Sequence, residues 1–528
     1  MRYVSITAVS ITALTIFLYS LASRLGWGVF DTGCPTYALN MIHQIVDYGY
    51  PASFPGVPNV PANYHQGTFW ISAKLVNLLS LDPYESLRWL ILITAGITVM
   101  TIIWFSSKLV KTEIALILVL TGYFSTSPPN GLYLPFELIK ESLGWYSYIS
   151  LFEYNVSTSW PIALFLILCI VLIYFKNQKT LFYPFIILLI LPFFNATAFT
   201  IVFITYCYVS LSWIYIESKN QWNRISIIKL LSNKIIVLFC YATVALVLPK
   251  YNISAFTISE DYEVVRLLPR FLEPRAWVTI IKYIALQPLI NWFSIIPAYY
   301  LIKSRKTCEK FVSFGFFLSL IFPLLIWIKS VDQWDNIHKF VVLTSFFSIF
   351  TWIFYLSNTS LNKKRIFYLA CTVSIIGSIP GLYNMGKSRM SFENLLPNFT
   401  QKTSPDNNLI KYLKDNNKKI IIISYGEKNL CGRLSDTVLS YGSFAAAGYY
   451  FENFLLSKQI EDNIKKDYEW DLENLEKIIK KYDKNQAIIV TPNNLKINLE
   501  SILKNNNLIV LDKISFEYYT ALKLKKID

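Results

Sequence analysis

The sequence predicts a polytopic transmembrane helical bundle of about 11 spans, followed by a small C-terminal α/β domain. Of the 528 residues, 54% are hydrophobic and 16% are charged, whereas a water-soluble chain carries roughly 25% charged residues. The mean hydropathy of +0.40 agrees with a protein that lies largely in lipid. This composition excludes a disordered chain. Seven cysteines are too few for a secreted domain held together by disulfides.

A membrane-spanning helix needs about 20 mostly apolar residues. Runs of this kind occur at residues 4–21, 89–106, 114–125, 160–175, 181–194, 198–216, 235–248, 277–301, 311–328, 340–356 and 366–379. The stretch from residue 181 to residue 216 is too long for one crossing, since a single helix of that length would extend about 54 Å. Pro192 and Asn195 offer a turn, so we expect a tight hairpin there.

The distribution of charge sets the orientation, because positive residues favour cytoplasmic loops. With a cytoplasmic N-terminus, the inner loops hold 16 basic residues and three acids, and the outer loops hold 10 basic residues and 13 acids. The net charge of +15 therefore marks the inner side of the membrane and does not indicate a nucleic-acid partner. We expect a multi-pass protein of the plasma (inner) membrane whose first helix is retained and not cleaved as a signal peptide.

Three outer segments are long, at residues 22–88, 126–159 and 249–276, whereas the cytoplasmic loops are short. Long loops on one face indicate that this face carries the chemistry. In the first of them, residues 37–46 and 68–81 have apolar positions at helical spacing and are expected to lie in the membrane interface. The Pro-rich stretch between them, residues 51–61, cannot be helical.

The chain divides into a transmembrane domain at residues 1–384, a polar linker at 385–404 and a soluble α/β domain at 405–528. Short apolar runs predict strands at residues 419–424, 486–491, 507–512 and 518–524, and residues 470–482 read as an amphipathic helix. The parity of eleven spans places this domain on the extracytoplasmic side. It has glycines but no phosphate-loop pattern, so a capping or partner-binding role is expected.

Three short motifs accompany this layout. They are Phe30-Asp31-Thr32 followed by Gly49-Tyr50-Pro51, then Tyr64-His65-Gln66-Gly67, and finally Trp334-Asp335-Asn336-Ile337-His338-Lys339. Together with a first span, a long outer loop of two interface helices, many short spans and an outer C-terminal domain, they resemble the GT-C class of polytopic glycosyltransferases. Members of this class take sugars from polyprenyl-phosphate carriers. Where the class has two acids in the first loop, this chain has Asp31 followed by Thr32.

The resemblance implies that Asp31 is the catalytic base of an inverting sugar transfer. An acid at the lipid–water boundary can accept the proton of an acceptor hydroxyl while its oxygen attacks the anomeric carbon. The alternative is a structural role, since Asp is also a preferred N-cap for a helix that starts at Thr32.

Two carboxylates in the second outer loop, Glu137 and Glu141, are four residues apart and would share one face of a helix. Such a pair could hold a divalent cation, Mg²⁺ or Mn²⁺, on a diphosphate. No other cofactor is indicated. The alternative is an exposed helix in which Lys140 offsets the two acids.

Basic residues of the outer loops are candidates for binding the phosphate of a lipid carrier, because Arg and Lys bind phosphate oxygens through charge-assisted hydrogen bonds. The expected substrate- and phosphate-binding residues are His65, Arg266, Arg270, Arg275, Asp335, His338 and Lys339. Ordinary ion pairing with neighbouring acids is the alternative for the arginines, and snorkelling at the end of a span is the alternative for Lys339.

The sequence thus predicts a membrane glycosyltransferase that moves a hexosyl or pentosyl group from a polyprenyl-(di)phosphate carrier. The acceptor is a glycan, a lipid or a protein on the outer face. An oligosaccharyltransferase, ligase or polymerase with the same donor type is an alternative. A polytopic transporter or flippase is a second one, but we find no internal repeat and one charged residue clearly within a span, Lys282.

Overall fold

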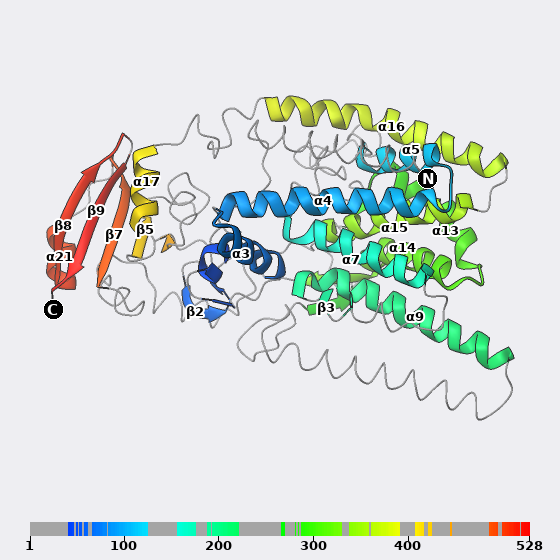
Figure 1. The fold of residues 1–528 in the computed structure, drawn as a ribbon, viewed down its shortest axis with the longest axis horizontal. Coiled ribbons are helices and arrows are strands. Elements are labelled where there is room, and N and C mark those ends of the chain that lie inside the picture. The colour runs from blue at the N-terminus through cyan, green and yellow to red at the C-terminus, as the bar shows by residue number, and fades with distance from the viewer. Residues whose placement is uncertain are drawn as a thin grey trace.

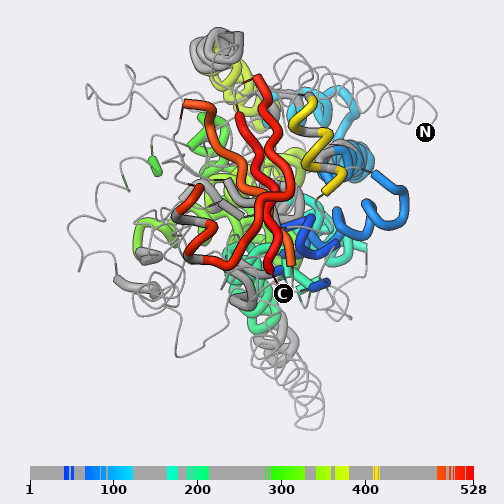
Figure 2. The backbone as a smooth tube through the Cα atoms, turned by 90° about the vertical axis from the view of Figure 1, so that its left-hand side faces the viewer, coloured from blue at the N-terminus to red at the C-terminus, as the bar shows by residue number. Residues whose placement is uncertain are grey.

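The computed structural model describes residues 41–46, 49–50, 52–54, 57–61, 66–81, 83–124, 156–175, 187–188, 190–191, 193–220, 266–269, 280, 283–284, 287–329, 337–357, 361–390, 407–416, 421–424, 444–445, 485–494, 499–517 and 519–527. Two parts are distinguishable within them. Long helices form a bundle, and a small sheet near the C-terminus lies at one end of it (Figure 1). Viewed along the bundle from that end, the strands stand in front of the helices (Figure 2).

The described helices of the bundle lie roughly side by side (Figure 1). They are α3 (Gly67–Leu79), α4 (Pro83–Ser107), α5 (Thr112–Phe124), α7 (Val156–Phe175), α9 (Ala196–Asn220), α12 (Leu289–Phe293), α13 (Ile295–Ile302), α14 (Thr307–Leu325), α15 (Ile337–Ser357) and α16 (Leu361–Met390). They fall where apolar runs predict helices. The predicted spans at residues 4–21 and 235–248 lie outside the described residues.

Two described helices are by themselves long and apolar enough to cross a membrane, at Thr307–Leu325 and Phe340–Ser357. Shorter apolar helical stretches occur at Gly96–Ser107, Ala163–Phe175, Thr197–Ser212 and Leu289–Ile302. The exposed large side chains along α4 are also apolar, at steps of three or four residues: Trp89, Ile93, Ile97, Met100 and Trp104. This stripe covers about 22 Å of helix from one tryptophan to the other, which suits a lipid-facing surface with aromatic residues at its two boundaries.

Helix α15 lies at the centre of the bundle. It packs against α14, α13, α7, α5, α12, α9 and α16. Every residue from Phe340 to Leu356 is buried, including Phe346, Phe347 and Trp352. A helix that is apolar on every face is stable only where apolar groups surround it, and here the side chains of the neighbouring helices surround α15.

Hydrogen bonds between side chains link α15 to its neighbours inside this apolar bundle. The Asn291 amide donates to Ser345 Oγ at 3.0 Å, and the hydroxyls of Ser294 and Ser348 share a hydrogen bond. Thr344 Oγ1 donates to Ser319 Oγ of α14 at 3.2 Å. Since unpaired polar groups are costly in an apolar environment, these pairings restrict the helices to one relative register.

Among the boundaries that differ from the sequence prediction, three change the layout of the chain. The span expected at residues 277–301 is interrupted, because Pro288 has extended backbone angles (φ −55°, ψ 144°) and α12 begins only after it. The span expected at 311–328 ends at Leu325, because Ile326 turns extended and enters strand β4 (Ile326–Lys329). Helix α16 continues to Met390 and so includes the first residues of the expected linker.

The helix that ends at Phe194 and the helix that starts at Ala196 are separated at Asn195, where the hairpin turn is expected. The side-chain Oδ1 of Asn195 accepts a hydrogen bond from the backbone N–H of Ala198 at 2.8 Å. Asn195 is therefore the N-cap of α9, which explains why helix α9 begins at this point.

The C-terminal part contains a five-stranded sheet in the order β6 (Phe444–Ala445), β5 (Ile421–Ser424), β7 (Gln486–Pro492), β9 (Tyr519–Lys526), β8 (Leu508–Ser515). Strand β5 is parallel to β6 and β7, and β9 is antiparallel to β7 and β8. Helices α17 (Asn407–Asn416) and α21 (Leu499–Asn506) accompany it. Leu409 and Leu413 of α17 pack on Ile488 and Val490 of β7. The four predicted strands and the α/β class are confirmed, and the helix expected at 470–482 lies outside the described residues.

The contact between α14 and α15 provides a test of the packing. A methyl group at Gly315 would collide with the ring of the buried Phe347, so Gly315→Ala should lower the stability by about 1–3 kcal/mol. We expect a lower thermal unfolding midpoint for the purified protein in detergent, and partial recovery when Phe347→Leu is added. The matched control is Gly122→Ala, whose methyl group meets only the flexible end of Ile349 at 2.9 Å and should change the midpoint less. Equal midpoints for the two variants would contradict this packing.

Candidate functional site

The Gly-Tyr-Pro motif of the first outer loop ends a short helix. Residues 41–46 are helical, and the backbone N–H of Gly49 donates to the carbonyl of Ile45 at 3.1 Å. Gly49 has a φ of +89°, a conformation in which a residue with a Cβ is strained. The glycine therefore serves as the left-handed residue that closes a helix C-terminus.

Gln66 of the Tyr-His-Gln-Gly motif connects the two ends of the Pro-rich stretch. Its Oε1 accepts a hydrogen bond from the Ala52 N–H at 2.8 Å, and its Nε2 donates to the Ala52 carbonyl at 3.3 Å. Both residues are buried. The amide thus pairs with the Ala52 backbone as a neighbouring strand would, and it closes the segment that contains strands β1 (Ser53–Phe54) and β2 (Val57–Pro61).

Gly67, which begins α3, lies directly against the turn before α9. A Cβ at this position would be 2.7 Å from Phe194 Cδ1 and 2.8 Å from Phe193 Cδ1, so only glycine allows this approach. The Phe193 ring also packs edge-on against Tyr50 and Trp70, with centroid distances of 5.7 and 6.1 Å. Two motifs that are separate in sequence therefore form one junction with the helix break at Asn195, which we call the first-loop junction.

Tyr50 is protonated at neutral pH within this junction. Burial raises the pKa of its hydroxyl to about 12, because the phenolate would lose hydration. Tyr50 can therefore donate a hydrogen bond but does not act as a base near neutral pH.

A second element between the helices is a two-stranded antiparallel ribbon formed by β3 (Arg266–Pro269) and β4. In its register Arg266 is directly opposite Lys329, and Pro269 is opposite Ile326. Directly opposed positions share one face of an antiparallel pair, and like charges there are destabilising unless an anion compensates them. The register therefore places two residues of like charge at opposed positions of the ribbon.

The same ribbon pairs the strand that carries Arg266 with the strand that precedes His338 and Lys339 in the chain. Arg266 comes from the third long outer loop, whereas β4 belongs to the connection between α14 and α15. His338 and Lys339 occupy the first turn of α15, a few residues beyond the end of β4. Pairing of β3 with β4 thus joins the arginine-bearing loop to the segment that carries the Trp-Asp-Asn-Ile-His-Lys motif.

The remaining candidates lie outside the described residues, so their predicted roles stay predictions: Asp31, His65, Glu137, Glu141, Arg270, Arg275 and Asp335. Within the part of the chain that the structure describes, no group of three or more His, Cys, Asp or Glu side chains could hold a metal ion. This search does not test the predicted cation site at Glu137 and Glu141, because both residues lie outside the described part of the chain.

The chain matches no protein-family profile and no curated protein by sequence. In structure, its helical bundle with a C-terminal sheet has the same fold over almost its whole length as a solved protein. That protein is ArnT from Cupriavidus metallidurans, whose crystal structure is bound to undecaprenyl phosphate. The TM-score is 0.50 at 7% sequence identity, and the match covers 98% of this chain and 97% of that one.

Sequence reasoning missed three residues that the structure brings into these elements. Gln66 and Phe193 organise the first-loop junction, and Lys329 faces Arg266 across the ribbon. The position of Gln66 inside a recognised motif was a usable signal. The sequence around Phe193 or Lys329 does not predict which residue each one contacts, because the partners come from distant segments of the chain.

The Gln66–Ala52 pairing can be tested with two substitutions. Gln66→Leu leaves the buried N–H and carbonyl of Ala52 without partners, at a cost of about 1–3 kcal/mol for each group. Gln66→Glu keeps the acceptor and loses the donor, so it should have an intermediate effect. We expect faster proteolysis and faster hydrogen exchange at Ser53–Pro61 in the order Leu, Glu, wild type. Identical exchange in the three proteins would show that the pairing does not hold this segment.

Proposed function

We propose that the chain is an integral-membrane glycosyltransferase that transfers a sugar from a polyprenyl-(di)phosphate carrier to an acceptor on the extracytoplasmic face. The observation that carries the proposal is the full-length likeness to ArnT, whose structure is bound to undecaprenyl phosphate. Undecaprenyl phosphate is chemically what remains of a polyprenyl-phosphate sugar after the sugar has left. The GT-C-like motifs of the first loop agree with the same class of reaction.

The opposed cations of the β3–β4 ribbon suit the phosphate of this carrier. Arg266 and Lys329 are opposite each other at an end of the ribbon, next in the chain to the segment that leads into His338 and Lys339. In this proposal, Arg266, Lys329 and Lys339 compensate the phosphate charge, with Arg270, Arg275 and His65 as further donors. Asp335 and His338 orient the group.

In the proposed reaction, Asp31 accepts the proton of an acceptor hydroxyl. The hydroxyl oxygen forms a bond to the anomeric carbon while the bond between that carbon and the carrier phosphate oxygen breaks, which inverts the configuration. The electron pair stays with the phosphate, whose increased negative charge the cations stabilise. If the carrier is a diphosphate, Glu137 and Glu141 would hold a divalent cation, Mg²⁺ or Mn²⁺, against it.

The proposal places the protein in the plasma (inner) membrane, with its N-terminus in the cytoplasm and the C-terminal domain outside. Its partners are the bilayer, a polyprenyl-phosphate-linked sugar donor and a glycan, lipid or protein acceptor. A lipid-linked donor is expected on this side because nucleotide sugars stay in the cytoplasm. Oligosaccharyltransferases, ligases and polymerases that share this donor differ in the acceptor, which an acceptor screen distinguishes.

The proposed base is tested by Asp31→Asn. The amide cannot accept the proton, so transfer from a polyprenyl-phosphate sugar should fall by at least about 100-fold, within the range of a lost general base. The measurement is transfer of a labelled sugar in membranes that contain equal amounts of inserted protein. The control is Glu85→Gln in the first turn of α4, which should keep wild-type transfer. Full activity of Asp31→Asn would refute the mechanism, and movement of the intact donor without transfer would indicate a flippase.

The cation pair is tested by Arg266→Gln and Lys329→Gln. Each should weaken binding of polyprenyl phosphate by about tenfold, because each removes one charged hydrogen-bond donor from the phosphate. The loss should appear in both KM and kcat, because the cations bind the donor phosphate and also stabilise its increased charge in the transition state. Lys329→Arg should preserve binding. Lys310→Gln in the first turn of α14 is the control and should bind as the wild type does. Unchanged binding in both ribbon variants would exclude the ribbon as the phosphate site.

A further inference from the structure

Three tyrosines and two lysines form a continuous chain of contacts where α13 and α15 end and α16 begins. Lys303 Nζ lies 4.0 Å from the ring centroid of Tyr299, and Lys363 Nζ lies 4.8 Å from that of Tyr355. The rings between them are in contact, with centroid distances of 6.1 Å for Tyr299–Tyr300 and 5.7 Å for Tyr300–Tyr355. We call these five residues the Lys–Tyr cluster.

The two tyrosines of α13 present their rings on the surface of the bundle. Tyr299 is 54% exposed and Tyr300 is 59% exposed, whereas Tyr355 is buried beneath them. Lys303 donates a hydrogen bond to the Tyr299 hydroxyl at 2.7 Å, and an ammonium group has two further N–H bonds to offer. The cluster thus combines exposed aromatic surface with cationic donors fixed beside it.

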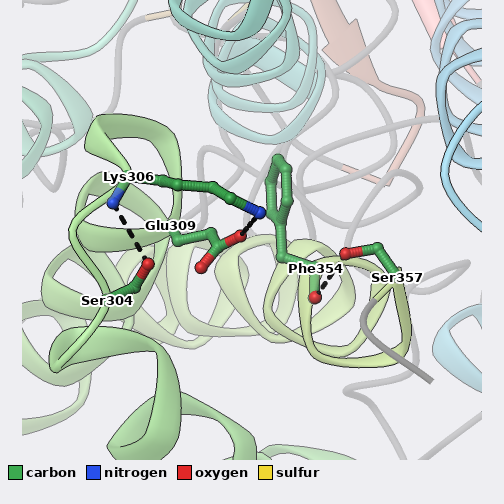
Figure 3. A network of polar contacts seen from close by, with 5 residues as sticks. All are labelled: Ser304, Lys306, Glu309, Phe354 and Ser357. Atoms are coloured by element: carbon green, nitrogen blue, oxygen red, sulfur yellow. Dashed lines mark hydrogen bonds and ion pairs between the residues drawn. The ribbon is translucent and has the colours of Figure 1, made fainter.

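The surrounding chain is strongly basic. Residues 299–310 and 357–365 contain seven cations and one acid, Glu309. Glu309 is buried, with its side chain 5% exposed, and pairs with Lys306 Nζ at 2.9 Å (Figure 3). The acid therefore compensates Lys306.

Exposed tyrosine rings beside lysines are the arrangement that suits a membrane boundary. Aromatic rings are stable against the glycerol and upper acyl region, and ammonium groups interact with headgroup phosphates. A soluble anion would interact with the lysines but would not cover the exposed tyrosine rings. We propose that the Lys–Tyr cluster is a binding site for an anionic phospholipid of the phosphatidylglycerol type, with Lys303 and Lys363 as the cations that attract its phosphodiester headgroup.

This site goes beyond the proposed glycosyl transfer and does not depend on it. Figure 1 places α3, with the first-loop junction, at one end of α4 and α13 toward the other end. The expected orientation assigns the cluster to the cytoplasmic leaflet, since the loops after α13 and before α16 are among the basic ones. The lipid bound here would therefore be a resident of the inner leaflet and not the carrier lipid of the reaction.

The experiment measures lipid retained by the full-length protein after purification from nanodiscs of phosphatidylglycerol and phosphatidylcholine, by native mass spectrometry. Lys303→Gln and Lys363→Gln should each lower phosphatidylglycerol retention by about fivefold, and the double variant by more than either. Lys303→Arg should retain lipid as the wild type does. The matched control is Lys74→Gln on α3, where Lys74 lies 5.6 Å from the Trp70 ring in a similar Lys–aromatic pair.

Three results would overturn the proposal. The first is unchanged retention in the double variant with a wild-type unfolding midpoint in lipid-free detergent. The second is an equal loss in Lys74→Gln, which would show a general effect of surface charge. The third is equal retention of phosphatidylcholine, or displacement of the lipid by millimolar inorganic phosphate, which would show that the cluster selects no lipid. If the double variant does not fold, the two single variants and Lys303→Arg decide the outcome by the same comparison.

Discussion

The hydrogen bonds between α15 and its neighbours are the interaction on which the rest of the structure depends. In an apolar environment the hydrophobic effect gives helices little reason to choose one partner over another, so polar pairs and close packing set the register. Asn291–Ser345, Ser294–Ser348 and Ser319–Thr344 provide those pairs, and Gly315 allows the close approach of α14. Because α15 contacts most of the other described helices, its register determines where their ends lie.

The segments between helices are organised where helices end, and two different local structures end them. At the first-loop junction, glycines at positions 49 and 67 permit a left-handed turn and a close ring contact, and Gln66 satisfies the backbone of Ala52. At the end of α14 the chain turns extended, and pairing with β3 satisfies its backbone groups. In both places the non-helical backbone forms its hydrogen bonds within the protein, as backbone near a membrane must.

Charge has a different origin at the two ends of the bundle. The lysines of the Lys–Tyr cluster lie where the sequence concentrates positive charge, at the end of α13 and the start of α16. Lys303 contacts Tyr299 one helical turn away, and Lys363 contacts Tyr355 on the neighbouring helix α15. The opposed Arg266 and Lys329 come from segments about sixty residues apart and meet only through strand pairing. Gly49, Tyr50, Gln66 and Gly67 belong to short motifs that are recognisable in the sequence, but the contact of Tyr50 and Gly67 with Phe193 is not.

The sequence by itself determined the class of the protein. Apolar runs, the asymmetry of charge and the alternation of short strands with helices in the tail predict a polytopic bundle with an α/β domain, because these patterns reflect local hydrophobicity and backbone preference. Only the tertiary structure decided that α15 is surrounded by protein, since an apolar helix looks the same whether lipid or other helices cover it. It also decided that the span after residue 277 is broken at Pro288 and that α14 gives way to a strand. These features depend on contacts with segments that are distant in the chain, so the local sequence does not predict them.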